Sequence, residues 1–351
     1  MAGTQFDIGE GMFFFFRRVG EKPMGALWLA FCQALVGAAL VALTLMLMGP
    51  VFINIFEMAE LDSSGAMTDA EITERMFSII GPMLAVMPLI GVGGIVIALM
   101  FQGAWLRFLV RGEIAAGIPF RLGSDEFRLL GVNLLYIVIA FAGYIGLVIA
   151  MVVVGGAAAL VFAGADGSIG GGLVGGLIAF VGALVIACVL VMVCIRLATA
   201  PGLTIRDRKL RFFESWSASN GVFWHMALSY LVVLGLILVL GSILSFLVQL
   251  VFLGALMPAL AQLSAVSNEM SGADVEQVFA QILTTISNPA VATGLIIGMT
   301  LSYLLQIVFE GMWHGVGAYN AVRYRADGQP EEMDSPVLGA DHPAGASPTN
   351  G

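Results

Sequence analysis

Six long apolar segments alternate with short polar segments along the chain. The apolar segments cover approximately residues 24–56, 77–109, 131–163, 168–199, 222–262 and 288–316. Each one exceeds the roughly 20 residues that a helix needs to cross the hydrocarbon core of a bilayer, so tilted or extended helices are expected. The pattern predicts an all-α fold, a polytopic transmembrane helical bundle with six spans.

The fifth apolar segment, 222–262, allows two interpretations. It can hold one span followed by an interfacial helix, or two short spans with a tight turn near Gly241. A seventh span would move Arg323 and Arg325 to the side of the membrane opposite to nearly all other basic residues. The distribution of positive charge therefore favours one span here.

The spans are arranged as three similar hairpins. An aromatic and charged segment precedes the first span of each pair, and the second span of each pair ends in polar residues. The hairpins cover about 24–109, 131–199 and 222–316, within a membrane domain at 24–325. This predicts a threefold repeat of helical hairpins.

Composition agrees with a membrane protein. Of the 351 residues, 59% are hydrophobic and only 11% are charged, whereas soluble domains carry about a quarter charged residues. An ordinary soluble protein is excluded. The net charge of −9 argues against a nucleic-acid partner. Cys32, Cys188 and Cys194 all lie in apolar segments, which favours burial as small hydrophobic side chains over disulfides or a metal site.

The basic residues predict the orientation of the spans. All of them except Arg75 lie before span 1, between spans 2 and 3, between spans 4 and 5, or after span 6. Acidic residues dominate the first and third loops on the other side. Because positively charged loops stay in the cytoplasm, we expect both ends of the chain to be cytoplasmic.

Two aromatic and basic segments are candidate membrane-surface anchors. Residues 1–23 form a cytoplasmic N-terminal segment with amphipathic character, and residues 205–220 precede span 5. Helices lying among lipid headgroups have this composition, and an aromatic belt that anchors any span is the alternative explanation. The anchor candidates are Phe13, Phe14, Arg17, Arg18, Arg211 and Trp216. The tail at 326–351 is rich in proline and polar residues and is expected to be disordered.

Span 6 carries the main group of polar residues within the membrane. Tyr303, Gln306, Glu310 and His314 are three or four residues apart and therefore share one helix face. Arg196 near the end of span 4 and Gln102 in span 2 complete the candidate cluster, with an Arg196–Glu310 pair expected. Such groups can form an ion relay or a headgroup cavity. Alternatively, they reach the interface and tie helices together.

The sequence offers no catalytic site, metal site or cofactor motif. The glycine-rich segments lack the lysine of a phosphate loop, and spacing such as that of Gly171 and Gly175 instead predicts close packing of spans 3 and 4. The carboxylates of Asp125 and Glu126 are expected to be solvated. Thr68 and Glu71 form a capping box, which predicts a short helix outside the membrane.

One segment resembles a known group of proteins. In 194–224, the residues Arg196, Leu197, Pro201, Ser215, Trp216, Phe223 and Trp224 resemble a pattern in uncharacterised six-span bacterial membrane proteins. Those proteins are similar to the membrane domain of some glycerophosphoryl diester phosphodiesterases. The resemblance covers about thirty residues and implies a bacterial inner-membrane location. It transfers no catalytic residue, because the phosphodiesterase barrel is not part of this chain.

Together, these observations predict that the chain is an integral inner-membrane protein without enzymatic activity. We expect it to support or organise an envelope process through contacts with membrane lipids, with a membrane-protein partner, or with a second copy of itself. The alternative is a transporter or permease subunit with a polar path near Glu310.

Overall fold

The computed structural model describes residues 6–63, 68–115, 117–164, 169–266 and 289–324. All elements within these ranges are α-helices. Their bounds are α1 Ile8–Glu21, α2 Pro23–Ser63, α3 Asp69–Arg111, α4 Ser124–Gly164, α5 Ile169–Leu197, α6 Ala200–Asp207, α7 Glu214–Ala218, α8 Phe223–Val266 and α10 Pro289–Arg323. The expected tail at 326–351 and the acidic loop residues at 267–288 lie outside the described residues.

Six of these helices, α2, α3, α4, α5, α8 and α10, are long and apolar enough to cross a membrane. This confirms the all-helical membrane fold. Helix α8 runs without interruption from Phe223 to Val266, so the segment at 222–262 is one helix and is not divided near Gly241. Pro50, Pro82 and Pro88 lie inside α2 and α3, whose helical structure continues through them.

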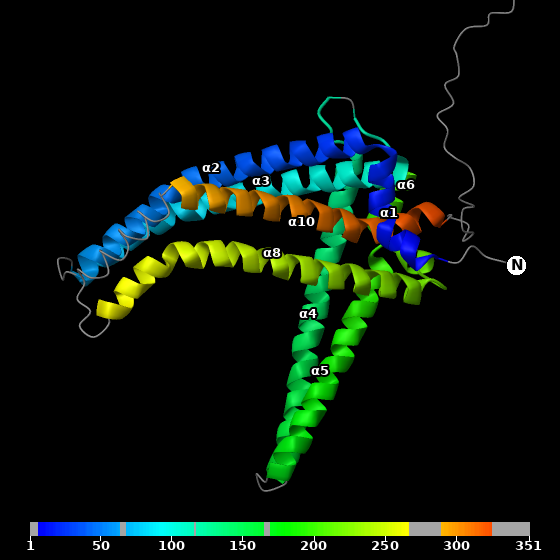
Figure 1. Cartoon of the computed structure of the whole chain (residues 1–351). Helices are drawn as coiled ribbons and strands as arrows, with labels where there is room; N and C mark the ends of the chain where they lie inside the picture. Colours follow the sequence, from blue (N-terminus) through cyan, green and yellow to red (C-terminus); the bar gives the residue numbers. More distant parts are fainter. Residues whose placement is uncertain (1–5, 64–67, 116, 165–168, 267–288, 325–351) are drawn as a thin grey trace, which may run out of the picture.

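The helices form two arms that meet at one end of the molecule. Helices α2, α3, α8 and α10 run side by side, whereas the α4–α5 hairpin leaves in a different direction (Figure 1). The spans pack in consecutive pairs, α2 with α3, α4 with α5, and α8 with α10. Equivalence of the three pairs as repeats stays a prediction.

Helices α1 and α6 lie where the two arms meet (Figure 1), and the short helix α7 packs against α5 and α6. We call this region the base. Its interior is aromatic. Phe14 and Tyr319 are fully buried and lie 5.5 Å apart between ring centroids, and Phe15 contacts Trp105. Burial of such rings against α10 and α3 holds α1 onto the bundle.

Glycines allow the helices of the base to approach closely. A Cβ atom added to Gly311 would lie 2.3 Å from the Phe15 ring, and one added to Gly317 would lie 2.4 Å from the carbonyl oxygen of Ala198. The close packing predicted for spans 3 and 4 is confirmed at Gly175, whose added Cβ would lie 2.8 Å from the carbonyl oxygen of Ala158. Small residues therefore set helix spacing in both regions.

Two expectations about local structure need correction. The capping box of Thr68 and Glu71 is present, but it begins the 43-residue helix α3 and not a separate short helix. Of the three cysteines, which are all free, only Cys32 is buried; Cys188 and Cys194 lie exposed on α5. An apolar span can expose small hydrophobic side chains because lipid, and not only protein, surrounds it.

Candidate functional site

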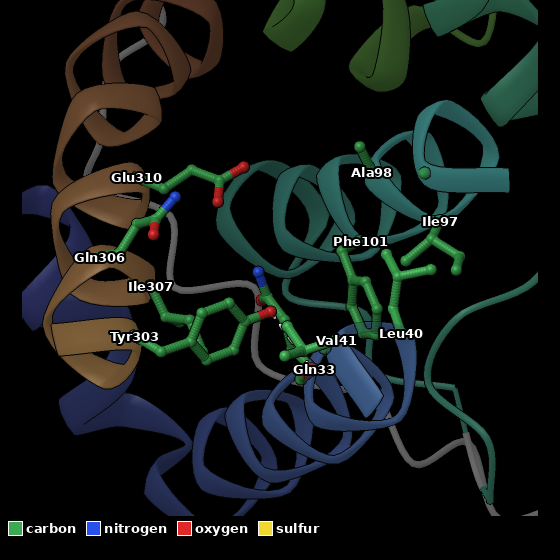
Figure 2. A pocket seen from close by; sticks show the side chains of 12 residues that line it. Gln33, Leu40, Val41, Ile97, Ala98, Phe101, Tyr303, Gln306, Ile307 and Glu310 are labelled. Carbon is green, nitrogen blue, oxygen red and sulfur yellow. Dashed lines mark hydrogen bonds between the residues drawn. The ribbon is translucent and has the colours of Figure 1, made fainter. Parts of the chain in front are cut away.

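A cavity of about 260 Å³ lies among α2, α3 and α10, and we call it the α10 cavity. Its polar residues are Gln33 from α2 and Tyr303, Gln306 and Glu310 from α10. The remaining lining is apolar or glycine: Gly37, Leu40, Val41, Gly94, Ile97, Ala98, Phe101 and Ile307. Figure 2 shows the polar side chains gathered toward α10, with Phe101, Leu40 and Ile97 on the opposite side. The cavity is therefore amphipathic.

Gln33 is held in place by two neighbours. The indole Nε1–H of Trp105 donates a 2.6 Å hydrogen bond to Gln33 Oε1, and both side chains are buried. Because this bond occupies the amide oxygen, the amide nitrogen is left to donate. Glu310 lies within reach of that nitrogen, so the carboxylate can accept from it.

The position of Tyr303 depends on Gly37. The Tyr303 hydroxyl donates a 3.3 Å hydrogen bond to the carbonyl oxygen of Gln33 (Figure 2). A Cβ atom on Gly37 would lie only 2.3 Å from that hydroxyl oxygen. Glycine at position 37 is therefore required for the ring to cross from α10 to α2 and close one side of the cavity.

Glu310 and His314 are neighbours on α10, as their spacing predicts. His314 Nε2 lies 3.8 Å from Glu310 Oε1, which is longer than a hydrogen bond. His314 does not line the cavity, whereas Glu310 does. The stripe of four polar residues on span 6 therefore divides into three residues that line the cavity and one beside it.

Arg196 and Gln102 do not belong to this cavity. Arg196 donates hydrogen bonds to Asn220 Oδ1 and to Ser219 Oγ, and its guanidinium lies over the rings of Trp216 and Phe223. The expected Arg196–Glu310 pair is therefore wrong. The physical reason is that the residues following α5 fold back and supply partners for Arg196 within the base.

Gln102 instead joins α3 to α4. Its Oε1 accepts a 2.9 Å hydrogen bond from Asn133 Nδ2. This contact ties together the two arms near the base, which agrees with the structural interpretation of the polar residues and not with a shared polar path.

The candidate anchors divide into buried and exposed side chains. Phe13 and Trp216 are exposed and remain suitable anchors. Phe14 is fully buried, which excludes it as an anchor, and the guanidinium groups of Arg17 and Arg18 lie 5.3 Å from its ring centroid. In an amphipathic helix, one face must bury its aromatic side chains, and here that face packs on α10 and not on lipid.

Two of the three basic anchor candidates, Arg18 and Arg211, are tied to protein groups as well. Arg18 Nε donates to the carbonyl oxygen of Leu109 at 3.1 Å. Arg211 forms ion pairs with Asp207 at 3.4 Å and Glu214 at 3.1 Å. Both residues therefore help to hold the base together, with part of each side chain left exposed.

A buried ion pair in the base contradicts an expectation from the sequence. Glu126, expected to be solvated, is 2% exposed and pairs with the equally buried Arg107. Its second oxygen accepts a 2.9 Å hydrogen bond from the backbone N–H of Gly123. The adjacent Asp125 pairs with Arg111 and Arg128. The expectation that Asp125 and Glu126 are solvated is wrong. Helical geometry shows that adjacent carboxylates point in different directions, but it does not show which other helices pack against them.

The sequence interpretation also missed Gln33 and Trp105 as parts of the site. A signal for Gln33 exists, since it is a polar residue inside the first apolar segment and such residues seek partners within a membrane. Among the residues described, no group of three or more His, Cys, Asp or Glu side chains could hold a metal ion.

Comparisons with models of protein families, with curated proteins and with solved structures found no match to this chain. The fold and the apolar helices define the class by themselves: this is a multi-pass integral membrane protein.

Proposed function

We propose that this protein supports or organises a process of the bacterial envelope by binding a membrane lipid in the α10 cavity, without enzymatic activity. The observation that carries the proposal is the amphipathic lining, with Gln33, Tyr303, Gln306 and Glu310 on one side and apolar side chains on the other. A lipid has the same division between its polar headgroup and glycerol region and its chains.

The proposal includes a location in the inner membrane with both ends in the cytoplasm. Its support is that basic residues from distant segments meet at the base. Arg18 donates to Leu109, Lys22 donates to the Gly112 carbonyl oxygen at 2.7 Å, and Arg206 donates to carbonyl oxygens at the end of α10. A positively charged end faces the cytoplasm. The inner-membrane assignment also draws on the resemblance of segment 194–224.

Filling the cavity tests lipid binding. Gly94 lines the cavity, and a Cβ atom added there would meet nothing within 4 Å. The side chain of Gly94→Leu can therefore enter the cavity without a clash at its Cβ atom. We expect the wild-type protein to retain lipid through purification and Gly94→Leu to lose it, measured by native mass spectrometry. Equal retention by both proteins would contradict the proposal.

Gly91→Leu is the matched control. Gly91 precedes Gly94 by one helical turn, also has open space for a side chain, and does not line the cavity. We expect this variant to retain lipid like the wild type. The control separates loss of the cavity from any general effect of adding leucine to α3.

A transporter or permease subunit is the second candidate, favoured by the line of Tyr303, Gln306 and Glu310 along α10. Carboxylates inside membrane proteins often mark ion or substrate pathways. In this case Glu310→Gln should abolish flux in reconstituted vesicles while leaving the unfolding temperature in detergent close to the wild-type value. Flux that is unchanged by the substitution would reject Glu310 as part of a path.

A further inference from the structure

The charges around the α10 cavity are unbalanced. Among the described lining residues, Glu310 supplies the only carboxylate, and neither lysine nor arginine is present. Arg196, which would have balanced it, is held in the base by Asn220 and Ser219. Among the residues described, the basic group beside the carboxylate is His314, whose Nε2 lies 3.8 Å from it and outside the lining.

We propose that the α10 cavity binds a primary ammonium group, carried by the headgroup of an aminophospholipid or by a small water-soluble amine. This inference rests on the proposed function and names the class of ligand. An ammonium group supplies the missing positive charge next to Glu310. A carboxylate in a low-dielectric environment is strongly stabilised by a cation that also donates hydrogen bonds to it.

Gln306 and Tyr303 fit the same ligand. An ammonium group has three N–H donors and no acceptor. The cavity offers acceptors for them in the carboxylate of Glu310, the amide oxygen of Gln306 and the hydroxyl oxygen of Tyr303. Tyr303 already donates its proton to the carbonyl oxygen of Gln33, so its lone pairs remain to accept. A phosphate or other anion would find no cationic side chain in this lining.

The cavity is large enough for a lipid headgroup but not for the acyl chains as well. A volume of about 260 Å³ is small compared with pockets that enclose a whole drug-sized ligand. An ethanolamine-sized group therefore fits inside, and acyl chains would continue along the apolar side. Val41, which lines that side, is 48% exposed on the outer surface of the protein, where lipid is present in a membrane.

Headgroup selectivity tests the inference. The delipidated full-length protein is titrated with phosphatidylethanolamine, phosphatidylcholine or phosphatidylglycerol, and bound lipid is measured by native mass spectrometry. We expect the wild type to prefer phosphatidylethanolamine by about tenfold, because phosphatidylcholine has no N–H donor and phosphatidylglycerol has no cation. Glu310→Gln should abolish this preference, and Glu310→Asp should restore part of it.

The outcomes distinguish the inference from the proposed function. Suppose that Gly94→Leu loses lipid binding and that the wild type shows no headgroup preference. This result would overturn the ammonium site and retain a lipid site. A preference that persists in Glu310→Gln would overturn it equally. Binding that is unaffected in Gly94→Leu would reject the cavity as the lipid site altogether.

Two controls complete the experiment. Glu113→Gln removes an exposed carboxylate outside the cavity and should leave the preference unchanged. Added ethanolamine tests the source of the amine: displacement of bound phosphatidylethanolamine shows that the amine alone is recognised, whereas selective binding without displacement assigns recognition to the lipid-borne headgroup.

Discussion

The buried pair of Arg107 and Glu126 gives a prediction at the scale of single residues. The side chains are 4% and 1% exposed, and the pair connects the end of α3 to the start of α4. Removing one partner leaves a buried charge without compensation, which costs about 3–5 kcal/mol. We therefore expect Glu126→Leu to lower the unfolding temperature in detergent strongly, as measured by intrinsic fluorescence.

The double variant Arg107→Leu with Glu126→Leu supplies the comparison. Replacement of both charged residues by apolar ones is often close to neutral, so we expect this variant to recover most of the lost stability. Glu113→Gln breaks two long pairs of an exposed carboxylate, with Arg111 and with Arg208, both at 3.6 Å. It should change stability by less than about 1 kcal/mol. Equal effects of the buried and exposed substitutions would contradict the burial of Glu126.

At the same scale, spacing along the chain predicted the polar stripe of α10 but not its partners. Residues three or four apart share a helix face whatever surrounds the helix, so Tyr303, Gln306 and Glu310 were brought together as expected. The partner of this stripe is Gln33, which lies 270 residues before Tyr303. No local pattern relates positions so far apart.

Packing of α1 against α10 gives a prediction at the scale of helices. Phe15 fits against α10 only because position 311 is glycine; an added Cβ atom would lie 2.3 Å from its ring. We expect Gly311→Ala to destabilise the protein by about 1–3 kcal/mol through overpacking. Displacement of α1 should also accelerate tryptic cleavage after Arg17 and Arg18, which limited proteolysis would detect.

Gly235→Ala on α8 is the matched control for this substitution. A Cβ atom at position 235 meets nothing within 4 Å. Alanine there should leave stability unchanged or raise it by up to about 1 kcal/mol, because alanine loses less conformational freedom in a helix than glycine. If both alanine variants had the same stability as the wild type, close packing at Gly311 would be refuted.

The helices themselves were largely predictable, and their lengths less so. Apolar composition indicated each span, and the capping box indicated where α3 begins. Their continuity was not evident, because α3 contains two prolines and still extends over 43 residues. At about 1.5 Å per residue, such a helix is roughly 60 Å long, about twice the thickness of the hydrocarbon core. It must tilt or extend beyond the core.

Orientation in the membrane is a prediction at the scale of the whole molecule. Cysteine variants Lys209→Cys in the base and Glu74→Cys near the start of α3 can be labelled with a membrane-impermeant maleimide, after the three native cysteines are replaced by alanine. We expect residue 74 to react in intact spheroplasts and residue 209 only after permeabilisation, because the basic end stays in the cytoplasm. The reverse pattern of labelling would contradict the orientation.

The sequence by itself determined the membrane class, the six long apolar helices and the separation of basic from acidic segments. Apolar length and helical periodicity are properties of consecutive residues, which is why they could be read along the chain. The tertiary structure alone decided that Arg196 contacts Asn220, that Glu126 is buried, and that Glu310 faces Gln33 across a cavity. These pairings depend on the fit of side chains between helices, and that fit is set where distant segments pack.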